Sequence, residues 1–445
     1  MRHTSANIKL FTYFILLALF GSFMLQLPWA YKTGEAVPYI DSLFTSISAI
    51  CVTGLSSLQM DIYTTFGFVI IMFLIEAGGL GILTFVSIFL SLTSKKISLV
   101  NRKIIKDYFI DDVDSSPRKI LRSIITYTLV IQTAGALALM PALHHAGEDL
   151  WIFYSFFLSV SAFCNAGFSP YNTSLFQFQD NPYLLTVIML LIIFGGLGFL
   201  VIKNVIQIIT KKTKHLYLHS KIVIFMTLTL IITGTAFVFF TERNRAFADF
   251  PLWKQITLSF FQSVTPRTAG FEVIPQADLA PSVSIFTITL MFIGGSSGSI
   301  AGGVKTTTAF IAILYVLNGN ESKNNINVGN RQIEPSLVNK AVTIISRSVL
   351  FIFVAILILT MTESASIANG SMKIIDIMFE TVSAFGTVGL SQGITGILTT
   401  GGKIVIILTM FIGRTGIFAM ALHITSKKKN NEFNIQYPTE RILLG

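Results

Sequence analysis

The chain has 445 residues, of which 52% are hydrophobic and only 12% are charged, and 39 are phenylalanine. A soluble domain would carry about 25% charged residues, so this composition excludes an ordinary soluble protein and indicates a polytopic membrane protein. The net charge of +10 could suggest nucleic-acid binding. The basic residues lie between hydrophobic segments, however, as in cytoplasmic loops, so we expect a lipid bilayer and no nucleic acid as partner. Two cysteines, Cys51 and Cys164, are too few for a disulfide framework.

Long apolar segments predict membrane-crossing helices, arranged as four pairs. About 20 apolar residues span the hydrocarbon layer. The first helices of the pairs are predicted at 10–27, 120–140, 221–240 and 342–361, and the second at 66–90, 183–209, 283–317 (interrupted) and 403–424. The first segment is longer than a signal-peptide core of about 7–15 residues, so we interpret it as an uncleaved helix. Between the members of each pair lies a shorter stretch, such as 40–51 or 151–164, which suits a re-entrant helix.

Four short stretches, at 46–55, 159–168, 262–271 and 381–390, are imperfect copies of one another. The ninth residue of each copy is a glycine: Gly54, Gly167, Gly270 and Gly389. One structural unit is therefore used four times. We predict an all-α polytopic membrane protein with four helix–pore loop–helix repeats around a central pore. The repeats are assigned to 1–100 (pore loop 40–57), 101–215 (pore loop 150–170), 216–335 (pore loop 251–273) and 336–425 (pore loop 374–392), followed by a cytoplasmic tail at 426–445.

The distribution of charge predicts the topology. Most of the 32 basic residues fall on the side of the two termini. The bias places both termini in the cytoplasm and the glycine motifs outside. Acidic residues on the outer side would concentrate cations at the mouth, although ordinary loop polarity explains them equally well. Asp41 and Asp376, each 13 residues before a repeat glycine, are expected to cap re-entrant helices rather than to bind ions.

The fourfold motif predicts a cation selectivity filter. Backbone carbonyls from four converging loops can replace the hydration shell of a potassium ion. Glycine is required because inward-pointing carbonyls need backbone angles that side chains disfavour. The alternative, four glycines that only pack helices, explains the common register less well. The predicted filter residues are Val52, Thr53, Gly54, Asn165, Ala166, Gly167, Thr268, Ala269, Gly270, Thr387, Val388 and Gly389.

The second helix of the third repeat contains a glycine-rich break at 294–308. A nucleotide-binding P-loop is excluded, because Val304 separates Gly303 from Lys305 and no strand precedes the segment. Non-helical backbone at membrane depth must face protein or a water-filled cavity. We predict a gating loop below the pore that includes Gly294, Gly295, Ser296, Ser297, Gly298, Gly302, Gly303 and Lys305.

Arg414 falls inside the last apolar segment, where the other repeats carry Gly79, Gly196 and Gly295. A charge in mid-membrane costs at least about 2.5–3.5 kcal/mol and is functional by default. We predict that Arg414 faces the pore as a barrier, where it repels cations or fixes the glycine-rich loop. Pairing with Glu76 or Glu380 is the alternative, and the two roles are compatible.

These motifs together resemble the Ktr/Trk/HKT superfamily of potassium transporters, and the length most resembles the bacterial Ktr membrane subunit. The resemblance covers about 10–424 and includes the filter glycines, the break in the third repeat and Arg414. It implies K+ uptake, in many members dependent on Na+, by a homodimer in the cell membrane. It also implies a cytoplasmic ring of RCK-type regulatory subunits that binds ATP or ADP, whereas this chain binds no cofactor.

Two rival readings are a K+-binding subunit of an ATP-driven pump and a K+/cation symporter. The pump subunit would be longer, and a symporter built from inverted repeats would need more broken helices than the single break that the sequence indicates. The six histidines form no metal-binding spacing. We therefore expect no enzymatic activity.

Overall fold

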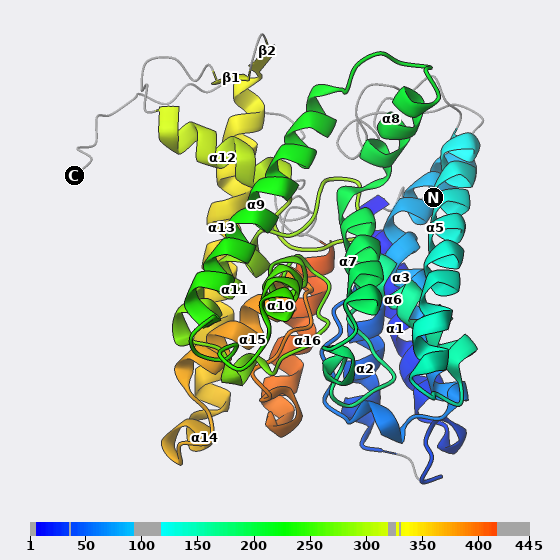
Figure 1. Ribbon diagram of the computed structural model, residues 1–445, viewed down its shortest axis with the longest axis vertical. Coiled ribbons are helices and arrows are strands. Elements are labelled where there is room, and N and C mark those ends of the chain that lie inside the picture. The colour runs from blue at the N-terminus through cyan, green and yellow to red at the C-terminus, as the bar shows by residue number, and fades with distance from the viewer. Residues whose placement is uncertain (1–5, 35–36, 93–116, 319–325, 329–330, 416–445) are drawn as a thin grey trace, which may run out of the picture.

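The computed structural model describes residues 6–34, 37–92, 117–318, 326–328 and 331–415 (Figure 1). The predicted tail at 426–445 lies outside the described residues. The fold is helical, as predicted. Its one sheet among the described residues is a hairpin of β1 (Ile326–Val328) and β2 (Arg331–Ile333), in which Ile326 pairs with Ile333.

Long and short helices alternate along the chain in a pattern that occurs four times. The long helices that begin each unit are α1 (Ala6–Leu25), α5 (Pro117–His145), α9 (Leu218–Glu242) and α13 (Pro335–Thr362). The short ones that follow are α2 (Tyr39–Cys51), α6 (Trp151–Phe163), α10 (Leu252–Val264) and α15 (Ile374–Gly386), with the small α14 (Ser364–Ala368) before the last. The units end with α3 (Thr65–Leu92), α7 and α8 (Pro182–Leu197, Phe199–Ile209), α11 and α12 (Pro281–Phe292, Thr306–Asn318) and α16 (Thr400–Thr415).

Each of the four short helices has 13 residues. At a rise of 1.5 Å per residue this is about 20 Å, less than the roughly 30 Å of a hydrocarbon core. By length and hydropathy, three helices among the described residues could cross a membrane: 122–145, Leu218–Glu242 and Pro335–Thr362. The bent pair α7–α8 adds a fourth if it is one span.

Serine hydroxyls fix three short helices against the long helices that precede them. Ser46 Oγ donates to Ala18 O (2.8 Å), and Ser159 Oγ donates to Gln132 O (2.7 Å). Ser263 Oγ donates to Ile231 O (2.8 Å) in the third unit. The helices approach this closely because a glycine lies three residues after each acceptor, at Gly21, Gly135 and Gly234. The short helices therefore lie in the interior, backed by the long ones.

The structure corrects one helix. The sequence indicates a continuous helix at 183–209, but Gly198 separates α7 from α8, and the two are bent by 102°. Gly198 has φ +85°, and a Cβ there would lie 2.7 Å from Ser296 Oγ. The expectation that only the third repeat is broken is therefore wrong, and the cause is a contact with a segment about a hundred residues away.

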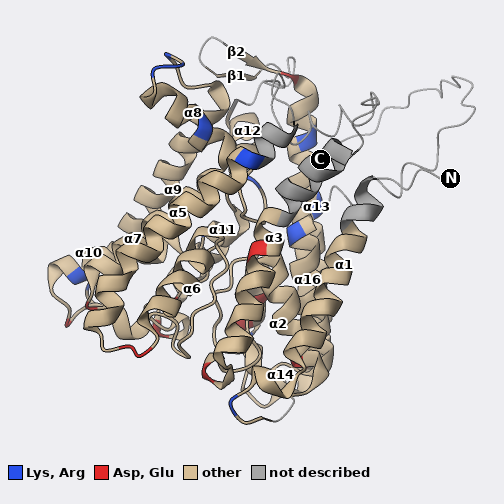
Figure 2. Cartoon of the chain, turned by 90° about the vertical axis from the view of Figure 1, so that its right-hand side faces the viewer, with Lys and Arg blue, Asp and Glu red and all other residues tan. Residues whose placement is uncertain are grey.

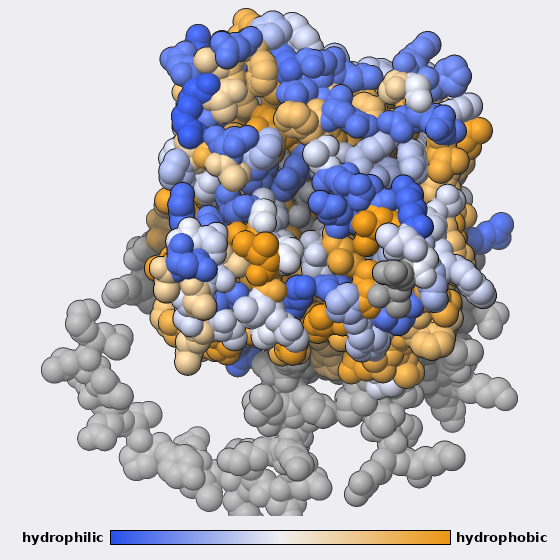
Figure 3. Space-filling view, turned by 90° about the horizontal axis from the view of Figure 1, so that it is seen from below, coloured by the Kyte–Doolittle hydropathy of each residue, from blue (hydrophilic) through white to orange (hydrophobic). Residues whose placement is uncertain are grey.

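Charged side chains mark the two ends of the molecule. In Figure 2 most acidic residues lie toward the end that carries α14, and most basic residues lie toward the end with the β-hairpin. Figure 3 shows hydrophilic side chains over much of the α14 end. Which of the two ends faces the cytoplasm stays a prediction.

Candidate functional site

The four repeat glycines form a closed ring in the interior. A Cβ at Gly54 would lie 3.0 Å from the Cα of Gly167, and one at Gly167 would lie 3.1 Å from the Cα of Gly270. The series continues from Gly270 to Gly389 (3.0 Å) and returns from Gly389 to Gly54 (3.1 Å). Loops that are more than a hundred residues apart therefore meet at one centre, and only glycine fits at these contacts.

The four loops share one backbone conformation. The ring glycines have φ between +72° and +99°, in the region that glycine tolerates best. The residue two positions before each glycine is also left-handed: Val52 (55°), Asn165 (56°), Thr268 (71°) and Thr387 (49°). Left-handed β-branched residues are true outliers, so the surrounding structure must enforce this shape.

Hydroxyl groups and buried side chains hold the loops. The Gly54 and Gly389 N–H groups donate to Ser48 Oγ and Ser383 Oγ, each at 3.1 Å. In the other two loops, Ser161 Oγ donates to Phe168 O (2.7 Å) and Thr265 Oγ1 to Phe271 O (2.6 Å).

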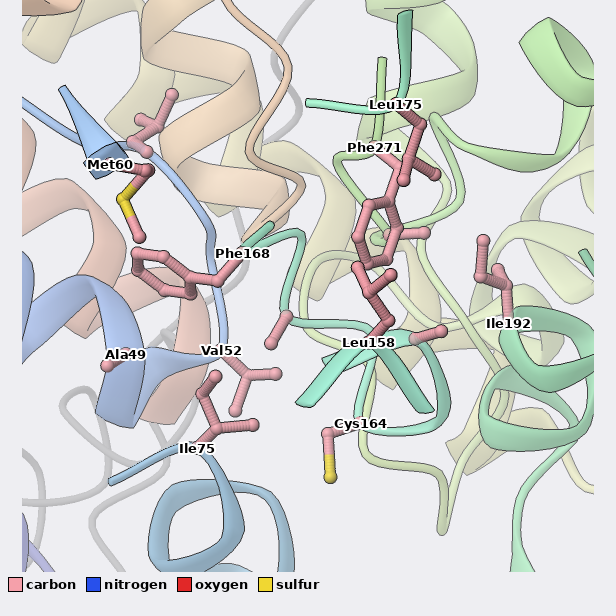
Figure 4. Packing of buried hydrophobic residues seen from close by; sticks show 14 of the residues in the cluster. Ala49, Val52, Met60, Ile75, Leu158, Cys164, Phe168, Leu175, Ile192 and Phe271 are labelled. Carbon is pink, nitrogen blue, oxygen red and sulfur yellow. The ribbon is translucent and has the colours of Figure 1, made fainter. Parts of the chain in front are cut away.

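The residue after each glycine anchors its loop in the core. These residues are Leu55, Phe168, Phe271 and Leu390, all at most 1% exposed. In Figure 4 Phe168 points toward Met60, and Phe271 lies beside Leu175. With these side chains buried behind the loops, the four backbones are left to face one another at the ring.

A non-helical segment, 293–305, lies beside the ring. It separates α11 from α12 and folds back on itself, since the Gly294 N–H donates to Val304 O (2.9 Å) and the Val304 N–H to Phe292 O (3.2 Å). Gly302 lies against Thr387, where an added Cβ would be 2.8 Å from Cγ2. Lys305 Nζ donates to Ala301 O within the segment. Gly302 of the predicted gating loop therefore adjoins the fourth predicted filter loop.

The break in the second unit receives this segment. The Ser296 N–H donates to Gly196 O (3.0 Å), and the Phe199 N–H donates to Gly298 O (3.1 Å). Ser296 Oγ also donates to Leu197 O. The bend at Gly198 thus leaves backbone groups free to form hydrogen bonds with the segment. The sequence did not indicate this contact.

Arg414 holds the segment from another side. Its guanidinium donates to Ile300 O and, at 2.7 Å, to Gly78 O. Arg414 is 6% exposed. Among the described residues it pairs with neither of the carboxylates considered from the sequence, since Glu76 accepts from Gln132 (2.5 Å) and Glu380 accepts from Thr395. The pairing alternative is therefore wrong, and the arginine bridges two backbone carbonyls instead.

Of the two acidic residues at the short-helix ends, only one has the role that the sequence predicts. Asp376 caps α15 as expected, because its Oδ2 accepts from the Lys373 N–H (2.9 Å). Asp41 instead accepts from Lys403 Nζ (2.5 Å) and from Ser57 Oγ (2.7 Å), which joins the first and last units. Lys403 begins a predicted helix far along the sequence, so no local signal indicated this pair.

Comparisons with known proteins bear on the family and the fold of the chain. The chain matches the TrkH family, described as cation transport proteins, over residues 3–436. It is 39% identical over 435 residues to the potassium/sodium uptake protein NtpJ of Enterococcus hirae, covering 97% of this chain and 95% of the relative. It is 34% identical to the Ktr system potassium uptake protein B of Bacillus subtilis, again covering 97% and 95%. The crystal structure of the potassium transporter TrkH from Vibrio parahaemolyticus has the same fold, with a TM-score of 0.74 and 19% identity over 96% of this chain and 87% of that one. The resemblance seen in the sequence is thus confirmed, and the chain belongs to the TrkH family of cation transport proteins.

Proposed function

We propose that this protein is the potassium-selective, ion-translocating membrane subunit of a K+ uptake system. The observation that carries this proposal is the closed ring of Gly54, Gly167, Gly270 and Gly389. Four loops of one conformation around a common centre can offer carbonyl oxygens to a dehydrated cation from four sides. The printed names of relatives at 39% and 34% identity, a potassium/sodium uptake protein and a Ktr system potassium uptake protein, support potassium as the substrate.

The predicted filter residues are assigned to the ring on this basis. The candidates at the two positions before each ring glycine are all at most 1% exposed. The carbonyl oxygens of Thr53, Ala166, Ala269 and Val388 each lie beside the glycine of a neighbouring loop. A cation at the centre would therefore be held by backbone oxygens and not by full charges.

The segment 293–305 is proposed as the gate. It is clamped between the bend at Gly198 and Arg414, and it adjoins the fourth filter loop at Thr387. Opening requires these contacts to be exchanged for others. We propose that a cytoplasmic RCK-type ring that binds ATP or ADP supplies the energy for this exchange. The Ktr system names of the relatives support the existence of a partner subunit.

The remaining features of the proposal rest on the resemblance to the Ktr/Trk/HKT superfamily and on the distribution of charge. The protein is a homodimer that crosses the cell membrane several times, with both termini cytoplasmic, and its K+ uptake depends on Na+. The separated charge at the two ends in Figure 2 supports this orientation. The chain itself carries no enzymatic activity and no resident cofactor.

Potassium flux into proteoliposomes tests the proposal against its rivals. We expect purified protein to pass K+ down its gradient without ATP hydrolysis, with K+ preferred over Na+. ATP added with the regulatory partner should raise the flux without changing the preference. A subunit of an ATP-driven pump would show no downhill flux alone, and a symporter would accumulate K+ against its gradient when driven by a second cation.

A further inference from the structure

We infer a sodium-binding site behind the filter, built from Glu380, Glu272, Ser391 and Thr395. The inference rests on the proposed function, because it places a second cation beside the proposed K+ path. The four residues come from the third and fourth units. Glu380 lies on α15, and the others follow Gly270 or Gly389 within six residues.

Glu380 is the centre of the site. Its side chain is 0% exposed, and its Oε1 accepts a hydrogen bond from Thr395 Oγ1. Its Oε2 is buried and has no hydrogen-bond partner in the part of the chain that the structure describes. A buried oxygen of a carboxyl group that lacks a partner is costly, so this atom needs a donor or a cation.

Glu272 brings a second carboxyl group to the same place. Its Oε1 accepts from the Ser391 N–H (3.1 Å), and Ser391 Oγ lies 3.0 Å from Thr395 Oγ1. Among the described residues, neither Glu272 nor Glu380 forms an ion pair with lysine or arginine. Two neighbouring carboxyl groups without a basic partner favour the entry of a cation.

The donor set determines which cation fits. Carboxylate and hydroxyl oxygens are hard ligands, which alkali and alkaline-earth ions prefer. Ser391 Oγ and Thr395 Oγ1 are 3.0 Å apart, a spacing that suits a small ion better than the larger K+. Calcium takes six to eight oxygens. Here Thr395 engages one Glu380 oxygen and the Ser391 N–H engages one Glu272 oxygen. The side-chain oxygens that remain are too few for Ca2+, so we assign the site to Na+.

Occupancy of this site would act on the filter. Glu272 follows the third filter loop, and Ser391 follows the fourth, so an ion bound between them and α15 would fix two of the four loops relative to each other. Sodium would then stimulate potassium flux without passing through the ring. This is a structural route to the proposed sodium dependence.

Thermal unfolding of the full-length protein in detergent tests the site directly. At a fixed K+ concentration, replacing choline chloride by NaCl should raise the unfolding temperature of the wild type, as ligand binding requires. Glu380→Gln should raise the half-saturating Na+ concentration at least tenfold. Glu242→Gln is the matched control: Glu242 is equally buried, but both its oxygens have partners, the Ala280 N–H (2.7 Å) and Arg245 (3.4 Å). It should lower stability to the same extent in both salts.

A second variant tests the site if Glu380→Gln does not fold. Ser391→Ala removes one proposed ligand oxygen at a partly buried position and should also weaken the Na+ response. The inference is wrong if NaCl and choline chloride stabilise the wild type equally, which would indicate bound water. It is also wrong if Ca2+ or protons, and not Na+, produce the Glu380-dependent shift. A Glu380→Gln variant whose potassium flux equals that of the wild type without Na+, and does not rise when Na+ is added, supports the site. Wild-type protein that passes no K+ at all would instead contradict the proposed function, whatever the unfolding data show.

Discussion

In the four ring loops, the residue types predict some backbone conformations and not others. The glycines were predictable, because four copies in one register are improbable without a shared constraint. The left-handed residues two positions earlier were not, because valine, asparagine and threonine are ordinary types there. Each such residue stores about 1–3 kcal/mol of strain. Tertiary contacts, which no local pattern encodes, hold them in place.

Gly54→Ser is expected to reduce the preference for K+ over Na+ about tenfold, or about 1.4 kcal/mol. Gly54 has φ +93°, and a Cβ there would lie 2.5 Å from Ala166 O, so the side chain must displace a neighbouring loop. Uptake of the two ions in a potassium-auxotrophic host measures the change. Gly147→Ser is the control, since Gly147 has φ +78° but no atom of the described residues lies within 4 Å of an added Cβ. An unchanged ion preference in Gly54→Ser would contradict the filter assignment.

Arg414→Ala is expected to raise K+ flux by one to two powers of ten while the ion preference is retained. Two effects contribute. The first effect is the loss of the contact with Ile300 O. The second is the loss of the repulsion between the guanidinium and a passing K+, about 4 kcal/mol at 4 Å for an effective dielectric constant of 20. Protein dipoles offset part of this repulsion.

Arg414→Lys separates these two effects. Lysine keeps the charge but cannot bridge two carbonyls in the same way. Low flux in Arg414→Lys indicates that charge is the barrier, and high flux indicates that anchoring is. Loss of folded protein in both variants, without a gain in flux, would show that the arginine is only structural.

At the scale of elements, apolar length predicted the helices, but not where they break. The long helices lie close to their predicted ranges, because a run of about 20 apolar residues in a bilayer can satisfy its backbone hydrogen bonds in few ways other than a helix. The bend at Gly198 was missed because its flanks are as apolar as those of a continuous helix. Its cause is the docking of Ser296 on Gly196 and Leu197, which depends on the folded arrangement.

Deletion of 296–303 is expected to raise K+ flux about tenfold and to weaken dependence on any cytoplasmic partner. The deletion removes the contacts with the bend at Gly198, with Arg414 and with Thr387. Flux in proteoliposomes with and without the partner measures the effect. Ser296→Ala, which removes only the hydroxyl that donates to Leu197 O and Ser297 O, should give a smaller change in the same direction. A well-folded deletion variant that conducts no better than the parent would show that the segment is not the gate.

At the scale of the whole molecule, the ring must close between its first and last units, and no repeat pattern shows how. The sequence predicts four similar units but does not state which side chains join unit four to unit one. The structure joins them by packing α16 against α2 and by the pair of Lys403 and Asp41 at 2.5 Å. Their side chains are only 12% and 7% exposed, so solvent screens this pair little.

Lys403→Met is therefore expected to destabilise the folded protein by about 3 kcal/mol, because it leaves the Asp41 carboxylate buried without its cation. The double variant Asp41→Asn/Lys403→Met should recover much of this loss, since no uncompensated charge remains. Unfolding in detergent measures both. Lys212→Met is the control, since it makes the same change at an exposed lysine. This control should cost less than about 1 kcal/mol. If the double variant is no more stable than Lys403→Met, the ion pair does not close the ring, and packing between α16 and α2 must do so alone.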